Sequence, residues 1–262
     1  MSLPLPPRPD LESLAPPEGV EPRRTATWPW WEVVLVTLAG FVIGVIAATP
    51  LYLWLKPDTS GAVDGPGLLI SAFVDLVLAG VLLLWLRGRH PGWSRVLGWP
   101  APGRRLRELA VGAGFGLGLE VVTVIASVAV AIILREVTGQ QVEDTVQIMP
   151  GLHGWSVVIL VVMAIVVAPV VEEFVFRGLL FRSLADRYGF WVGAIASAVP
   201  FGLTHAGVGT AVDLWALRIT LTIVGVLLAW VHWRRRNLLA NIAAHATFNV
   251  IGVVVVLAMI RS

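Results

Sequence analysis

Long apolar blocks recur along almost the whole chain, and they constrain its fold more than any other feature. The blocks cover residues 31–54, 67–86, 109–134, 155–184, 190–206, 211–233 and 238–260. A helix of about 20 apolar residues crosses a bilayer, and most of these blocks reach that length. The chain is 57% hydrophobic and 14% charged, more apolar than a soluble protein of 262 residues could enclose. The sequence therefore predicts an all-α fold, a polytopic transmembrane helical bundle of about seven spans in a lipid bilayer.

The first 27 residues differ in composition from the rest of the chain. They contain seven prolines among scattered charges, at positions 4, 6, 7, 9, 16, 17 and 22. Such a segment buries too little apolar surface to fold, so residues 1–27 are predicted to be a disordered, proline-rich cytoplasmic tail. Residues 28–262 are then the transmembrane domain. Trp28, Trp30 and Trp31 at its start are expected to lie in the interfacial belt of the membrane.

Basic residues are distributed unevenly over the loops between the spans. Fourteen of the 19 lysines and arginines fall on the side of the N-terminus, and Lys56, Arg135 and Arg261 fall on the other. The positive-inside rule then places the N-terminus in the cytoplasm and the C-terminus outside. We expect an integral protein of a prokaryotic plasma membrane. The net charge of +2 gives no reason to expect a nucleic-acid partner, and the lack of cysteine excludes disulfides and thiolate chemistry.

Three ionisable residues lie close together within the apolar block at 155–184, namely Glu172, Glu173 and Arg177. Charge at bilayer depth costs a few kcal/mol per residue, about 2.5–3.5 on insertion scales, so these groups need a use. Glu173 and Arg177 are spaced i, i+4 with the acid first, which favours an ion pair on one helix. Glu172 points about 100° away around the helix. Pro169 lacks a backbone N–H and is expected to loosen the helix just before the acids.

Two later spans carry further polar residues within apolar helices. His205 lies near the end of the block at 190–206, and Asn241, His245 and Asn249 share one helical face at i, i+4 and i+8. Taken singly, such residues more often form helix–helix hydrogen bonds than catalytic sites. At helical rise, however, Glu172, His205, His245 and Asn249 lie about 18, 22, 10 and 16 Å above the cytoplasmic interface. These depths allow one shared site, in a polar cavity expected to open to the cytoplasm.

Such a set of groups has the components of an amide hydrolase that activates water. A carboxylate beside an imidazole in a low-dielectric cavity can take a proton from water. Glu172, His205 and His245 could also hold Zn²⁺ or another divalent metal with one position open, so the residues leave a metal site and a metal-free mechanism equally open. Asn249 and a second histidine can donate hydrogen bonds to an oxyanion. The H-E-x-x-H and G-x-S-x-G motifs are both absent.

These segments resemble the three motifs of a known family of intramembrane proteases. The motifs are E-E-F-V-F-R at 172–177, F-G-L-T-H at 201–205 and H-A-T-F-N at 245–249. The family is the CAAX-protease and bacteriocin-processing (Abi) family, which includes the type II CAAX prenyl endopeptidases, and the resemblance covers about 150–260. It implies an endopeptidase acting on membrane-associated or C-terminal peptides. It also implies that Glu172 and His205 activate water, that His245 and Asn249 stabilise the oxyanion, and that Glu173 and Arg177 shape the site.

Two other functions remain open, and the first of them would use the same fold. A non-proteolytic membrane scaffold or immunity-type protein would not need the intact polar set. An ion-coupled transporter would use Asp75, Glu120, Glu172 and Arg218 as an ion path, but the chain lacks the internal repeat typical of transporters. Arg218 is expected to be neutralised by Asp75 or Glu120, because buried membrane charges usually pair. Close helix packing is expected at the glycine series 112, 114, 116 and 118.

Overall fold

The computed structural model describes residues 25–57, 64–142, 154–205 and 209–261, and within them it contains helices and no strands. The helices are α1 (Trp30–Leu55), α2 (Gly65–Arg89), α3 (Trp93–Leu97), α4 (Arg105–Thr138), α5 (Trp155–Val162), α6 (Ala168–Glu172), α7 (Arg182–Tyr188), α8 (Phe190–Leu203), α9 (Ala211–Arg235) and α10 (Leu238–Arg261). A 3-10 turn, η2 (Pro102–Arg104), precedes α4, and two π-helical segments, η3 (Met163–Val167) and η4 (Glu173–Phe181), flank α6.

The predicted membrane spans correspond closely to these helices. Six helical stretches in the described residues are long and apolar enough to cross a bilayer, and the continuous stretch from Trp155 to Tyr188 counts as one of them. The seventh predicted block, 190–206, forms the shorter helix α8 of 14 residues. At 1.5 Å per residue it is about 21 Å long, less than the roughly 30 Å of a hydrocarbon core. The chain is thus an integral membrane protein, and His205 follows directly after the short helix α8.

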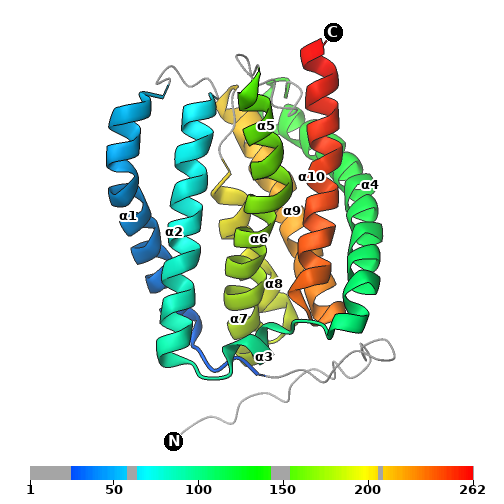
Figure 1. Ribbon diagram of the computed structural model, residues 1–262. Coiled ribbons are helices and arrows are strands. Elements are labelled where there is room, and N and C mark those ends of the chain that lie inside the picture. Colours follow the sequence, from blue (N-terminus) through cyan, green and yellow to red (C-terminus); the bar gives the residue numbers. More distant parts are fainter. Residues whose placement is uncertain (1–24, 58–63, 143–153, 206–208, 262) are drawn as a thin grey trace, which may run out of the picture.

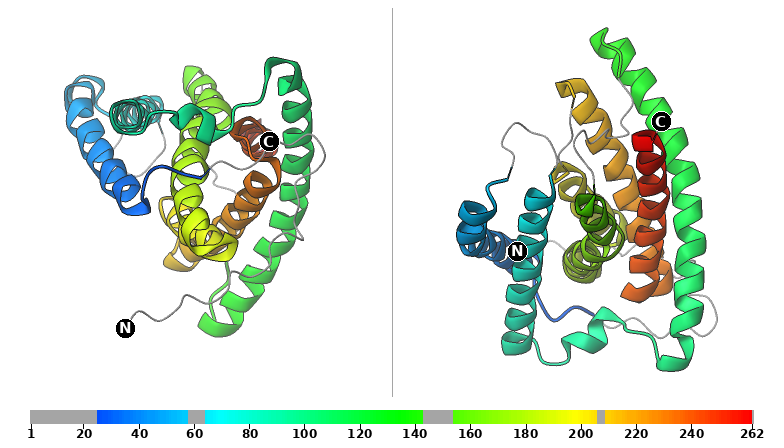
Figure 2. Two further views of the ribbon diagram at one scale, coloured as in Figure 1. Left: turned by 90° about the horizontal axis from the view of Figure 1, so that it is seen from below. Right: turned by 45° about the horizontal axis from the view of Figure 1, so that its top comes forward.

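The helices form one bundle around the stretch α5–α7. Figure 1 shows α1 and α2 on one side of this stretch, α4 and α10 on the other, and α8 and α9 behind it. The views in Figure 2 confirm that α1 and α2 lie beside each other, as do α4 and α10. The stretch that carries the paired glutamates is therefore surrounded by helices from both halves of the chain.

Two glycines of α4 allow its close contact with α10. A Cβ atom on Gly112 would meet the carbonyl oxygen of Ala240, and one on Gly116 would meet that of Ala244. The other two glycines of the predicted series have open space around them. The expected packing is therefore present at the i, i+4 pair alone, where the two backbones approach without intervening side chains.

Trp28 is buried in the bundle, which corrects its expected place in the interfacial belt. Its side chain is 2% exposed, and its indole N–H donates to the carbonyl oxygen of Leu179 at 3.2 Å. Two residues earlier, the backbone N–H of Ala26 donates to Asp186 at 2.6 Å. Only residues 25–27 of the predicted tail are described, while Trp30 and Trp31 are exposed as expected. Trp28 is buried because the segment before α1 packs against η4, which is far away in the sequence.

A buried polar cluster joins α4, α9 and α10 at the end of the bundle where the loop arginines gather, hereafter the arginine-rich end. Arg235 donates to Glu108 from Nε at 3.0 Å and from a terminal nitrogen at 2.5 Å. The Asn237 amide also donates to Glu108 at 3.0 Å, and its oxygen accepts from the backbone N–H of Ala240. Because all the charges are paired, the cluster fixes the ends of three helices without leaving a lone ion buried.

Candidate active site

The stretch that presents the two glutamates changes its helical pitch on both sides of them. The π-helical segment η3 ends just before Pro169, and η4 begins at Glu173. This confirms the expected loosening, since Pro169 provides no N–H for the preceding turn. Wider turns occur often at functional sites because they leave backbone groups available to side chains. One carbonyl of η3, that of Ala164, accepts a hydrogen bond from the Asn249 amide at 2.6 Å.

Glu173 is the centre of a fully buried network of polar side chains. Its Oε1 accepts from Arg177 and from Nδ1 of His245, each at 2.9 Å, and its Oε2 accepts from the Asn241 amide at 2.8 Å. The predicted i, i+4 ion pair is therefore present. The Glu173 side chain is 0% exposed and that of Arg177 is 1% exposed, so neither charge is solvated. Arg177 also donates to the backbone carbonyl of Gly225 in α9.

Glu172 faces a different space from Glu173, as its position on the helix predicts. Its Oε2 lies 4.0 Å from Nε2 of His205 and 3.9 Å from Nε2 of His245. The side chains of Glu172 and His205 are 25% and 29% exposed, whereas that of His245 is only 4% exposed. The structure thus brings together three residues from α6, from the end of α8 and from α10. They lie near enough for one small molecule to touch all three.

The hydrogen bonds of the two Nδ1 atoms orient both imidazole rings relative to Glu172. Nδ1 of His205 lies 2.7 Å from the carbonyl oxygen of Phe201, and Nδ1 of His245 lies 2.9 Å from the Glu173 carboxylate. Both partners are acceptors, so each Nδ1 carries the proton, and Nε2 of a neutral ring presents a lone pair. Both Nε2 atoms lie about 4 Å from Glu172 Oε2, which has no hydrogen-bond partner among the described residues. Acceptor atoms that converge in this way can bind a water molecule, which donates hydrogen bonds to them, or a cation.

An aromatic ring supports the charged groups from the side of α8. The guanidinium carbon of Arg177 lies 4.2 Å from the centre of the Phe201 ring. The same ring packs edge-on against His205 at 4.9 Å and against His245 at 5.8 Å. Phe201 is buried, so it holds these three side chains apart and keeps water from the ion pair. Its carbonyl, as described above, also orients His205.

Asn241 and Asn249 have different contacts in the structure. Asn241 is fully buried and donates both to Glu173 and to the backbone carbonyl of Leu228. Sequence reasoning placed it on the face of His245 but gave it no role in the site, although the i, i+4 spacing was a usable signal. Asn249 uses one amide hydrogen on Ala164 and keeps a second one. The hydrogen bonds in the described residues do not link it to either glutamate.

The expected pairing of Arg218 with Asp75 or Glu120 is wrong. No ion pair joins them in the part of the chain that the structure describes. Arg218 instead donates weakly from Nε to the backbone carbonyl of His205 at 3.5 Å. Asp75 lies on α2, which packs against α6, and it interacts electrostatically with Glu172. The prediction failed because helical rise gives the depth of a residue but not the direction in which its helix faces.

The donor atoms have the chemistry of a metal site but not its spacing. A carboxylate and two imidazoles whose Nδ1 atoms are held by oxygen acceptors resemble the usual ligands and supports of zinc. Ligands at about 2.0–2.1 Å from a tetrahedral metal lie about 3.3 Å apart, whereas these atoms lie 3.9 and 4.0 Å apart. Within the described residues no group of three such side chains is placed to hold a metal. Binding of Zn²⁺ or another divalent metal by Glu172, His205 and His245 therefore stays a prediction.

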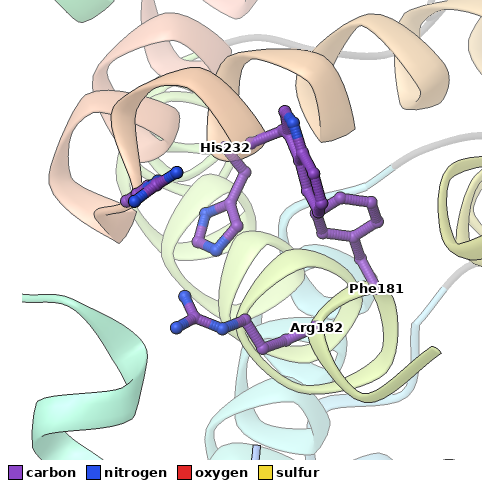
Figure 3. A pocket seen from close by; sticks show the side chains of 5 residues that line it. Phe181, Arg182 and His232 are labelled. Carbon is purple, nitrogen blue, oxygen red and sulfur yellow. The ribbon is translucent and has the colours of Figure 1, made fainter. Parts of the chain in front are cut away.

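A separate small cavity lies at the arginine-rich end of the bundle. Its walls are formed by five side chains of η4, α7 and α9 and of the residue after α9: Phe181, Arg182, His232, Trp233 and Arg236. Figure 3 shows Arg182 and His232 directed into it, and burial there lowers the pKa of the Arg236 guanidinium. None of the six candidate site residues lines this cavity.

Comparisons with known proteins match the part of the chain that holds the site. Residues 154–251 match the family described as "Type II CAAX prenyl endopeptidase Rce1-like". A curated relative from Bacillus subtilis strain 168, "Putative membrane peptidase YdiL", is 27% identical over 124 residues, which are 47% of this chain and 47% of that protein. The match thus spans about half the length of that relative. No solved structure matches the chain. The resemblance carried by the three motifs is therefore confirmed for residues 154–251, which are similar to the Rce1-like family of type II CAAX prenyl endopeptidases.

Proposed function

We propose that this protein is an intramembrane endopeptidase that hydrolyses peptide bonds of membrane-associated or C-terminal peptide substrates. The observation that carries the proposal is the position of Glu172 Oε2, about 4 Å from the Nε2 atoms of both His205 and His245. Polar atoms at this separation are bridged well by one water molecule. The family match supports a peptidase of the CAAX type.

In the proposed reaction, Glu172 and His205 position and deprotonate the attacking water. The water donates to Glu172 Oε2 and to Nε2 of His205, and its oxygen is left free to attack the peptide carbonyl carbon. The carboxylate takes one proton as the new C–O bond forms. It then delivers this proton to the leaving nitrogen as the C–N bond breaks, giving a carboxylic acid and an amine. Proton transfer by a positioned group of this kind is worth about 10²–10⁴ in rate.

The oxyanion of the tetrahedral intermediate needs hydrogen-bond donors next to the attacked carbonyl. In the proposal they are Nε2 of His245 when this ring is protonated and the second amide hydrogen of Asn249. Glu173 holds the His245 ring by its Nδ1, and Ala164 holds the Asn249 amide, so both donors are oriented in advance. Removing one such donor typically costs about 10²–10³ in kcat.

The test is the isosteric variant Glu172→Gln, assayed on a library of fluorogenic membrane-anchored peptides. The amide cannot accept a proton, so we expect kcat to fall about 10³-fold or more while thermal unfolding in detergent is unchanged. Glu120→Gln is a matched control, because Glu120 also lies in a spanning helix but is not a candidate site residue. Wild-type kcat in the Glu172 variant would reject the assignment. An inactive wild-type protein across the whole library would instead favour a scaffold role.

We further propose that the arginine-rich end faces the cytoplasm of a prokaryotic cell, so that the N-terminus is inside and the C-terminus outside. The clustering of Arg89, Arg105 and Arg235 at one end of the bundle supports this orientation. Reporter fusions to residue 262 and to residue 1 should then be active in opposite compartments. Fusions that are both active in the same compartment would contradict the orientation.

A further inference from the structure

Arg218 of α9 lies directly beside the end of α8 that carries His205. Its Nε donates to the His205 carbonyl at 3.5 Å, and its guanidinium carbon lies 5.7 Å from the centre of the Trp215 ring. The two helices are in close contact here, because a Cβ atom on Gly202 would meet the Arg218 carbonyl oxygen. Arg218 is half-buried, and it lies next to the proposed water-activating pair.

The three fully buried arginines of the spanning helices have carboxylate partners, whereas the half-buried Arg218 has none among the described residues. Arg177 pairs with Glu173, Arg182 with Asp186 and Arg235 with Glu108. In the described residues no carboxylate lies within ion-pair distance of Arg218. An arginine within a spanning helix is unfavourable when nothing offsets its charge. A carboxylate from outside the chain would offset that cost.

We propose that Arg218 binds a carboxylate of the peptide substrate and so selects peptides that carry one close to the cleaved bond. This inference rests on the proposed peptidase function. Nε is directed to the His205 carbonyl and Trp215 supports the guanidinium, so the two terminal nitrogens are left to bind a carboxylate side by side. An extended peptide advances about 3.3 Å per residue, so a group bound next to His205 lies roughly one to three residues from the attacked carbonyl.

The carboxylate has two possible sources in a peptide, the C-terminal end and the side chain of Asp or Glu. Both present the same planar pair of oxygens. The two sources are distinguished with matched peptides built on a sequence that the wild-type protein cleaves. One peptide ends in a free acid within three residues of the cleaved bond, one ends in the amide, and one ends in the amide but has Glu in that segment.

The experiment compares kcat/KM for these three peptides in the wild-type protein and in Arg218→Gln. We expect the wild-type protein to favour the free acid, the Glu peptide or both over the plain amide by about 10- to 100-fold, the range of a charge-assisted hydrogen bond. Arg218→Gln should lose this preference by acting on KM, and Arg218→Lys should restore part of it. Arg105→Gln, at an exposed arginine of the opposite end, should behave as wild type.

Two results would overturn the inference while leaving the peptidase function intact. One is equal cleavage of all three peptides by the wild-type protein. The other is an equal loss for all three in Arg218→Gln, which would give Arg218 a purely structural role, such as reaching the membrane interface. Failure of the wild-type protein to cleave any peptide would count against the proposed function itself.

Discussion

His245 and Glu173 form a 2.9 Å hydrogen bond across 72 positions of the sequence, and this bond joins α10 to the stretch that carries both glutamates. Because Nδ1 of the ring is held by Glu173, Nε2 is directed toward Glu172. One imidazole therefore connects the fully buried carboxylate of Glu173, which is paired, to the half-buried carboxylate of Glu172, whose Oε2 has no hydrogen-bond partner among the described residues. The two adjacent glutamates have opposite surroundings, and variants at each should differ in kind.

Glu173→Gln is expected to destabilise the protein as well as inactivate it. Removing the carboxylate leaves Arg177 buried without its partner, a loss of about 3–5 kcal/mol in the free energy of unfolding. Denaturant unfolding in detergent micelles measures this loss. Glu136→Gln, at an exposed position near the end of α4, is the matched control and should unfold as wild type. A Glu173 variant as stable as the control would show that the pair contributes nothing to folding.

The variants Asn241→Ala and Asn249→Ala should distinguish a structural role from a catalytic one. Asn241 donates to Glu173 and to a backbone carbonyl in full burial, so its loss should lower the unfolding free energy by about 1–3 kcal/mol and reduce kcat. Asn249 is only partly buried and should affect kcat more than stability, by about 10²-fold if it supports the oxyanion. Measuring both quantities for each variant is decisive. If Asn249→Ala lowered stability more and Asn241→Ala lowered kcat more, Asn249 would have the structural role and Asn241 the catalytic one.

Alanine substitutions along α4 should distinguish the glycines that contact α10 from those that do not. Gly112→Ala and Gly116→Ala place a methyl group against carbonyl oxygens of α10 and should cost about 1–3 kcal/mol through overpacking. Gly114→Ala and Gly118→Ala meet open space and should be neutral or gain up to about 1 kcal/mol from helix propensity. The readout is thermal unfolding of the four variants side by side. Similar losses in all four would exclude the contact as the cause.

Chelation tests whether a metal takes part. The Nε2 atoms of His205 and His245 lie farther from Glu172 Oε2 than a tetrahedral zinc site requires, so we expect activity to survive dialysis against a strong chelator. Elemental analysis of the dialysed protein provides the check. Loss of activity that is restored by Zn²⁺ at one ion per chain would contradict this expectation and assign the metal to these residues.

The sequence predicted the helices well because the bilayer imposes their length. Predicted and observed bounds agree to within about four residues for every span, and the 14-residue α8 had already been expected to be short. The predicted depths allowed Glu172, His205 and His245 to meet, and they do, whereas Asn249 bonds to the carbonyl of Ala164. Depth along a helix follows from rise alone, so the positions of Glu172 and His205 could be compared before the fold was known.

What the sequence could not provide was the rotation of each helix about its axis. Asp75 and Arg218 have suitable depths for a pair, yet Asp75 lies near the like charge of Glu172, and Arg218 donates to the His205 carbonyl. The place of Trp28 was missed for a similar reason. Its aromatic neighbours in the sequence suggested the membrane surface, but its partner Leu179 is 151 residues away, and local patterns do not reveal such contacts.

The pairing of Arg177 with Glu173 also has a consequence for the order of synthesis. Asn241 and His245, the other partners of this carboxylate, follow it by 68 and 72 residues. At about 5–20 residues per second, they are made roughly 3 to 15 seconds after Glu173. Arg177 follows by only four residues and comes from the same helix, so it is available as soon as that helix forms. The nascent chain thus carries its own counter-ion into the membrane and keeps the carboxylate paired until the last helix arrives.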